Sequence, residues 1–90
     1  MITKDTTLEL EVLKEIEVYK PLLDIELKLD KPFSYLSLIA EKYGVSEGLV
    51  FNKSLDLFSF YKSNFDISSK QAIYDSIIET HYLVATRKFD

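Results

Sequence analysis

The sequence contains no cysteine, which excludes disulfides, thiolate zinc sites and cysteine nucleophiles. It has two glycines, Gly44 and Gly48, and both stand in helical context, which excludes a glycine-rich loop that cradles phosphate. The single histidine, His81, has no ligand at helical spacing, so metal binding or catalysis would need partners from elsewhere in the chain. We therefore expect no catalytic residue, no metal, no cofactor and no enzymatic activity.

Basic residues are outnumbered, with 11 Lys and Arg against 15 Asp and Glu and a net charge of −4. Eight of the carboxylates lie in residues 1–31, beside five lysines. This balance argues against non-specific affinity for nucleic acid or anionic membranes, which requires clustered Lys and Arg. A local basic patch remains compatible with it.

Long apolar runs are missing as well. The longest, such as residues 38–40, are far too short to cross a bilayer. Residues 1–5 lack the apolar run and small-residue cleavage site of a secretory signal. We expect a cytoplasmic protein with no membrane partner.

What the sequence does contain is enough apolar material for one small core. A chain of 90 residues has room for a single domain, which we expect to span residues 1–90. Apolar residues make up 47% of it, including six Phe and six Tyr. Each aromatic side chain can bury about 150–250 Å², which offsets the poor surface-to-volume ratio of a short chain.

The first third of the chain has the spacing of an amphipathic helix. Apolar residues recur at three- and four-residue steps over residues 8–27, opposite a polar row that includes Lys20 and Lys31. Residues 6–9 (TTLE) have the spacing of a capping box that would start this helix. Pro21 should kink or split it.

A strand is the alternative for parts of the same region. Residues 8–12 and 25–29 alternate strictly between apolar and polar, which is typical of a half-buried strand. Such segments would form a two-stranded ribbon beside the central helices. We favour the helix, because no tight Asn-Gly or Asp-Gly turn separates the two segments.

Three further helices are indicated. Residues 30–34 (DKPFS) form a break, after which Ser34 can cap a short helix that runs to Tyr43. Ser46 can cap a second helix that ends near Lys62. A last helix can be capped by Asp66 or Ser68, with a buried stripe of Ile73, Ile77, Thr80 and Val84 beside Phe89. The predicted fold is an all-α bundle of four to five helices that contains a helix-turn-helix.

Residues 39–52 (IAEKYGVSEGLVFN) resemble the helix-turn-helix of DNA-binding regulators and are most similar to the tetracycline-repressor family, over a segment that spans residues 36–54. Ala40 lets two helices cross closely, Gly44 makes the turn without a Cβ penalty, and Val50 returns to the shared core. The resemblance implies a small transcriptional regulator that binds duplex DNA, with a dimer expected because one recognition helix seldom gives useful affinity.

The resemblance also implies which residues meet the DNA. In such motifs the second helix enters the major groove by its N-terminal end. The residues placed there are Lys42, Ser46, Glu47, Gly48, Phe51, Asn52 and Lys53. The two lysines would contact phosphates, and Asn52 would read an adenine edge.

A second hypothesis follows from the acidic charge. Glu47 would face the DNA polyanion, and Phe51 lacks a hydroxyl that could donate to a phosphate. An acidic protein-binding module, such as an inhibitor, an immunity protein or an adaptor, would instead meet a basic protein partner through Glu11, Glu15 and Asp24 and bind no DNA. Glu11 and Glu15 are four residues apart, so we expect both to line a solvated helix face.

The second helix of the motif is apolar on more than one face. Its large side chains include Phe51, Leu55, Phe58, Phe60 and Tyr61. Burial in the monomer core is the commoner reason for such a pattern, and a homodimer or another partner contact is the alternative.

Overall fold

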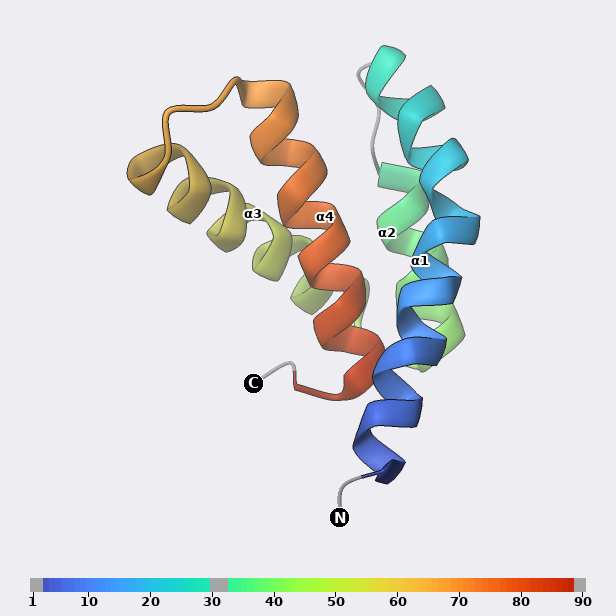
Figure 1. Ribbon diagram of the computed structural model, residues 1–90. Coiled ribbons are helices and arrows are strands. Elements are labelled where there is room, and N and C mark those ends of the chain that lie inside the picture. Colours follow the sequence, from blue (N-terminus) through green and yellow to red (C-terminus); the bar gives the residue numbers. More distant parts are fainter. Residues whose placement is uncertain (1–2, 30–32, 89–90) are drawn as a thin grey trace.

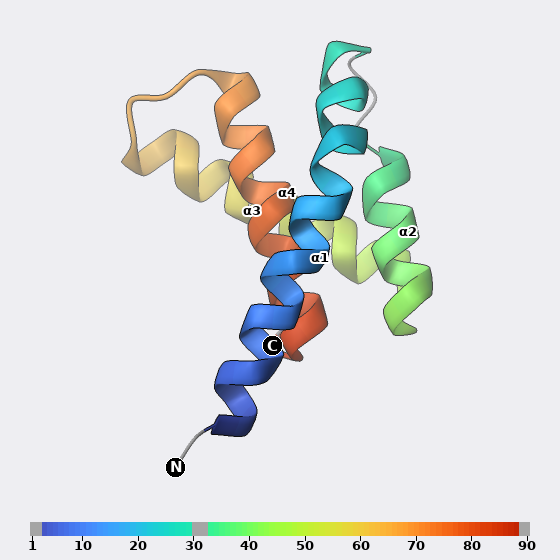
Figure 2. The same ribbon diagram turned by 45° about the vertical axis from the view of Figure 1, so that its right-hand side comes forward.

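Four helices follow one another along the described chain. They are α1 (Thr3–Lys28), α2 (Phe33–Tyr43), α3 (Glu47–Asn64) and α4 (Ser69–Thr86). The computed structural model describes residues 3–29 and 33–88, with side chains described for residues 8–29 and 34–88. α4 stands between α3 and α1 (Figure 1), and α1 and α2 lie side by side (Figure 2). The predicted all-α fold is confirmed for these residues.

The alternating segments of the first helix form no strand. Residues 8–12 and 25–28 both lie inside α1. Val12, Ile16 and Leu23 recur at helical steps and are buried. The helical period therefore decides this region, since it brings the largest apolar side chains to one face. The two-stranded ribbon is wrong.

Two local predictions about α1, its capping box and the effect of Pro21, can be compared with the structure. The helix begins at Thr3, so Thr6 lies within it and the capping box is misplaced. Of the kink or split predicted at Pro21, the split does not occur, since the helix continues to Lys28. The proline is exposed, and it lacks the N–H that would donate to the Glu17 carbonyl in a regular helix.

The start of α2 is satisfied by a residue of α1. Of the break predicted over residues 30–34, residues 30–32 lie outside the described residues. Residues 33 and 34 lie inside α2, so Ser34 does not cap it. The Tyr35 N–H donates to the Glu26 carboxylate at 3.1 Å. Glu26 is buried and stands at the positive end of the α2 dipole. A carboxylate nine residues earlier in the chain thus replaces the expected local cap.

α3 and α4 form a helical hairpin through residues 65–68 (Figure 1). Ser46 takes the N-cap position of α3, as predicted, although its side chain accepts no cap hydrogen bond. Of the two residues predicted to cap α4, Ser68 does so, accepting from the Gln71 N–H at 3.1 Å. α4 ends at Arg87, which adopts a left-handed φ of 61°.

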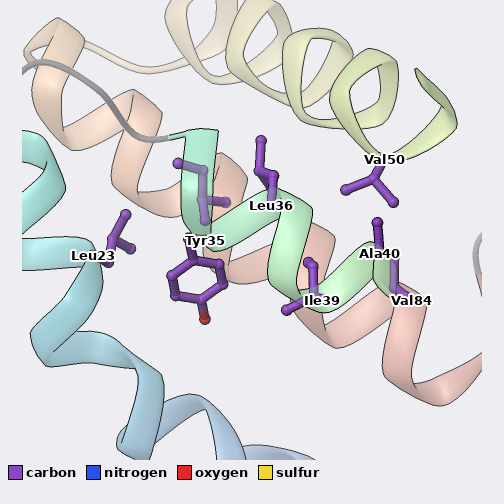
Figure 3. Packing of buried hydrophobic residues seen from close by; sticks show 8 residues of the cluster. Leu23, Tyr35, Leu36, Ile39, Ala40, Val50 and Val84 are labelled. Atoms are coloured by element: carbon purple, nitrogen blue, oxygen red, sulfur yellow. The ribbon is translucent and has the colours of Figure 1, made fainter. Parts of the chain in front are cut away.

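The core lies where α2 meets the other helices. Figure 3 shows Val50 of α3 above Ala40 of α2, with Leu23 of α1 and Val84 of α4 on the other sides of α2. The main cluster of buried residues comprises Leu23, Tyr35, Leu36, Ile39, Ala40, Val50, Ile77 and Val84. α2 is the shortest helix, and it contributes four of these eight residues.

The apolar stripe predicted for α4 is part of this core. Ile77, Thr80 and Val84 are buried, and Ile73 is half-buried. Phe89, predicted beside the stripe, lies outside the described residues.

The apolar side chains of α3 are less enclosed. Leu55 is 62% exposed and Phe60 is 53% exposed, whereas Phe51 and Phe58 are half-buried. Burial in the monomer core therefore does not account for the first two. The predicted homodimer contact stays a prediction.

Candidate interaction site

The corner between α2 and α3 is built by a glycine C-terminal motif. Gly44 has φ of 65°, a left-handed conformation in which glycine carries no Cβ penalty. Its N–H donates to the Glu41 carbonyl at 3.3 Å, and the Val45 N–H donates to the Ala40 carbonyl at 2.9 Å. This pair of bonds is the Schellman arrangement. Ala40 and Val50 are both buried in the main cluster, so both helices contribute to the shared core.

The seven residues predicted to meet DNA differ in their surroundings. Four are exposed near the start of α3: Ser46, Glu47, Gly48 and Asn52. Phe51 and Lys53 are half-buried, and Phe51 packs against the core. Lys42 is exposed but forms an ion pair with Glu15 of α1. Its charge is thus already matched within the molecule.

A hollow of about 550 Å³ lies at this corner, and we name it the corner hollow. Its lining residues are Ser34, Ser37, Leu38, Glu41, Val45 and Glu47. None of these six is basic, and both carboxylates are exposed. Residues 41–56 carry three carboxylates and two lysines, one of which is the paired Lys42. The surface is therefore acidic where a DNA reader needs positive charge.

Behind the corner, a set of hydrogen bonds joins α1, α2 and α4, and we name it the His81 network. His81 is fully buried, with Nδ1 2.6 Å from Tyr35 Oη and Nε2 2.7 Å from Glu15 Oε1. The Tyr43 hydroxyl donates to the same Glu15 oxygen at 2.5 Å. Lys42 donates to the other oxygen. One carboxylate of α1 is thus bound by two side chains of α2 and one of α4.

The contacts around the imidazole fit a neutral His81 that carries its proton on Nε2. In that form the Tyr35 hydroxyl donates to Nδ1, and Nε2–H donates to Glu15. A charged imidazole would present two donors and leave the Tyr35 hydroxyl hydrogen without an acceptor in the core. Burial lowers the pKa of His81 and outweighs the opposing effect of Glu15. Burial also raises the pKa of Tyr35, which stays a donor.

Glu15 carries the negative charge of the network. Burial alone would raise the pKa of this carboxyl, but hydrogen bonds from Lys42, Tyr43 and His81 outweigh that effect and lower the pKa to about 2. The hydrogen bond between Lys42 and Glu15 also raises the pKa of Lys42. The prediction that Glu11 and Glu15 share a solvated face is right for Glu11 and wrong for Glu15, whose side chain is only 15% exposed. Helical spacing alone does not show that a partner on α4 covers one of two neighbouring carboxylates.

The imidazole is closed off from solvent. The Tyr19 ring meets Tyr35 and His81 edge-on, with centroids 5.4 and 5.1 Å away. Both ring nitrogens of His81 are occupied, so in this conformation it contacts no substrate. Within the described ranges, no group of three or more acidic, histidine or cysteine side chains is placed to hold a metal ion.

Sequence reasoning missed the His81 network because its members lie far apart along the chain. Glu15 is 66 residues from His81, and Tyr35 is 46 residues from it. The one available signal was the position of His81 beside Thr80, within the apolar stripe of α4. A polar side chain placed there must find a hydrogen-bond partner.

Comparisons with known proteins add no relative. No protein family, curated protein or solved structure matches this chain. No helix in the described part of the chain is long and apolar enough to cross a membrane. The chemistry of the corner and of the helix faces therefore carries the functional argument.

Proposed function

We propose that the protein is an acidic protein-binding module that meets a basic partner at the corner hollow. The charge of that corner carries the proposal, because Glu41 and Glu47 line it while Lys42 is neutralised by Glu15. A partner Lys or Arg can lay its aliphatic stem along Leu38 and place its charged head between the two carboxylates. Such pairing accelerates association and selects against acidic partners.

The same charges weigh against duplex DNA as the partner. Neutralising phosphates requires free Lys or Arg, and each carboxylate at the surface is repelled. The residues predicted to meet DNA include one glutamate and two lysines, of which Lys42 is paired and Lys53 is half-buried. A DNA-binding regulator is the second candidate, favoured by the burial of Ala40 and Val50 on either side of the Gly44 turn.

The test measures binding of a labelled Arg-rich peptide by fluorescence anisotropy. The double variant Glu41→Gln/Glu47→Gln should bind the peptide about three- to tenfold more weakly than the wild type, as expected for the loss of two partly solvated charge pairs. The control is Glu11→Gln/Asp66→Asn, which makes the same change in net charge at two exposed positions. Because the sequence alone suggested Glu11 as a partner contact, this control also compares the first helix with the corner. This control should stay within about twofold of the wild type.

Equal weakening in both double variants would overturn the proposal, because the peptide would then respond to net charge and not to the corner. The same titration with duplex DNA tests the second candidate. Tight binding of the duplex by the wild type, strengthened more in Glu41→Gln/Glu47→Gln than in the control because two repelled carboxylates are removed at the corner, would favour the regulator.

A further inference from the structure

α4 packs against each of the other three helices, yet one of its faces stays open. α1 and α3 both pack on α4, while their backbones do not approach each other within the described ranges. α2 contacts both of them and fills the space between them on one side of α4. Figure 1 shows α4 standing between α3 and α1.

The open face forms a groove of about 520 Å³, which we name the α4 groove. Its floor is formed by Asp75, Ile78, Glu79 and Tyr82, and its walls include Leu13 of α1 and Tyr61 of α3. The floor residues follow the spacing i, i+3, i+4, i+7, which is one stripe of a helix. They span about two turns, or about 10 Å along the axis.

A helix face flanked by two other helices has the shape that receives a further helix. Side chains of an incoming helix would interdigitate with the floor stripe, as neighbouring helices do in bundles. Leu13 is 50% exposed on one wall, and Ile78 is half-buried on the floor. Covering them would remove apolar surface from water, which is the main driving force of such docking.

The charge of the α4 groove is negative. The Gln71 amide donates to Asp75 at 2.9 Å, and the Tyr61 hydroxyl donates to Glu79. Burial together with Glu79 raises the pKa of Tyr61 to about 12, so this hydroxyl stays a neutral donor. No salt bridge reaches either carboxylate among the side chains that the structure describes. Both negative charges are thus available to a cation from outside.

We propose that the α4 groove binds an amphipathic helix of a partner protein, with an aliphatic stripe flanked by Lys or Arg. The aliphatic stripe would cover Leu13 and Ile78, and the basic residues would pair with Asp75 and Glu79. This inference rests on the proposed protein-binding function but uses a surface separate from the corner hollow.

A nitrogen-15 NMR titration tests the site directly. The probe is a synthetic helical peptide with Leu at i, i+3, i+4 and i+7 and Lys on both flanks, and the control peptide has Glu in place of every Lys. The Lys peptide should shift amide signals of Tyr61 and of residues 13–16 and 75–83, which line the groove. The Glu peptide should bind at least about tenfold more weakly, because like charges repel across the groove.

A double variant removes the groove charge without removing its hydrogen bonds. Asp75→Asn and Glu79→Gln keep an acceptor oxygen for Gln71 and Tyr61, so the fold should persist, which thermal unfolding checks. Binding of the Lys peptide should weaken about three- to tenfold. The control Glu11→Gln/Asp66→Asn should bind as the wild type does. The single variant Leu13→Ser should also weaken binding, since its side chain is half exposed and its loss leaves the core intact.

Several results would overturn the inference. These are equal binding of the Glu peptide, signal shifts only at residues that do not line the groove, no shift at all, or self-association that buries the groove against a second copy. The titration with the Arg-rich peptide, which tests the corner hollow, distinguishes failure of this inference from failure of the proposed function. If the Arg-rich peptide still binds the wild type and binding is weakened only in Glu41→Gln/Glu47→Gln, the proposed protein-binding function holds and only the α4 groove proposal fails.

Discussion

At the scale of single residues, His81 links more of the molecule than any local pattern indicates. Its two ring nitrogens reach Tyr35 on α2 and Glu15 on α1 from a fully buried position on α4. Such a network is stable only when every member is satisfied, because an unpaired polar group in the core costs free energy. The network can be tested by replacing the imidazole and by changing its protonation state with pH.

Replacing His81 by Phe should lower the free energy of unfolding by about 2–4 kcal/mol, because it leaves the Tyr35 hydroxyl and part of Glu15 without partners in the core. Urea unfolding measures the loss as a lower midpoint with an unchanged slope. Tyr82→Phe is the control. Tyr82 follows His81 in the sequence and its side chain is half-exposed, so this substitution should leave the midpoint near that of the wild type. A midpoint unchanged in His81→Phe would show that the network does not stabilise the fold.

Stability should fall on the acid side of neutrality. The folded-state pKa of His81 lies below its ordinary 6.5, so the unfolded chain takes up the proton first and stability is lost as the pH falls below 6.5. The pKa of Glu15 is lowered from 4.5 to about 2, so a second loss occurs as the pH falls through that interval. The melting temperature measured from pH 8 to pH 2 should decline in both windows.

Substitutions of His81 and Glu15 show which residue causes the loss of stability in each pH range. His81→Phe should lose the decline that begins near pH 6.5, and Glu15→Gln should lose the decline between pH 4.5 and 2. On the alkaline side, burial raises the pKa of Tyr35 and Tyr43, so stability should fall as the pH rises above their ordinary 10. A melting temperature that increases on acidification below pH 6.5 would contradict the neutral His81.

At the scale of the elements, the sequence predicts helices well and their tertiary caps poorly. The recurrence of Val12, Ile16 and Leu23 was enough to predict α1, because burial of one face dominates a helix's stability. The cap of α2 by Glu26 was not predictable, since the carboxylate comes from another helix and Ser34 offered a plausible local substitute. In the same way, Glu15 looked solvent-facing because nothing near it in sequence indicated α4 as its neighbour.

The two glycines near the corner allow a comparison of the same substitution, Gly→Ala, in a left-handed and in a helical conformation. Gly44→Ala should destabilise the fold by about 1 kcal/mol, because a left-handed φ of 65° strains a residue with a Cβ although no atom lies within 4 Å of it. Gly48→Ala should instead stabilise by up to about 1 kcal/mol, since its position is helical and the nearest atom, Ser46 Oγ, is 3.6 Å away. Thermal unfolding of both variants measures the difference. Equal effects would show that the corner does not require a left-handed residue.

The buried cap of α2 gives a further prediction. Glu26→Ala should lower the free energy of unfolding by about 1–3 kcal/mol, because it leaves the Tyr35 N–H without an acceptor at a helix N-terminus. Asp24→Ala, an exposed carboxylate on the same helix, is the control. Urea unfolding that ranks Asp24→Ala as the more damaging change would contradict this role of Glu26.

At the scale of the whole molecule, the helices enclose a small core and leave two acidic hollows at the surface. The molecule measures 39 × 27 × 23 Å, and α4 packs against each of the other three helices. The all-α fold followed from sequence periodicity, but the acidity of the corner did not, because it depends on Glu15 of α1 reaching Lys42 of α2. The sequence around Gly44 therefore predicts a turn between two helices, whereas the partner of this corner depends on the charges around it.

The central claim is that this corner meets a basic protein and not DNA. Its most direct test is a fluorescence-anisotropy titration of the wild-type protein against mixed-sequence duplex DNA at about 50 and about 200 mM salt, where counterion release makes phosphate binding steeply salt-dependent. We predict no binding of the duplex at either concentration, beside clear binding of the Arg-rich peptide at the lower one. Duplex binding at about 50 mM salt that is lost at about 200 mM would contradict the claim and make the DNA-binding regulator the primary function.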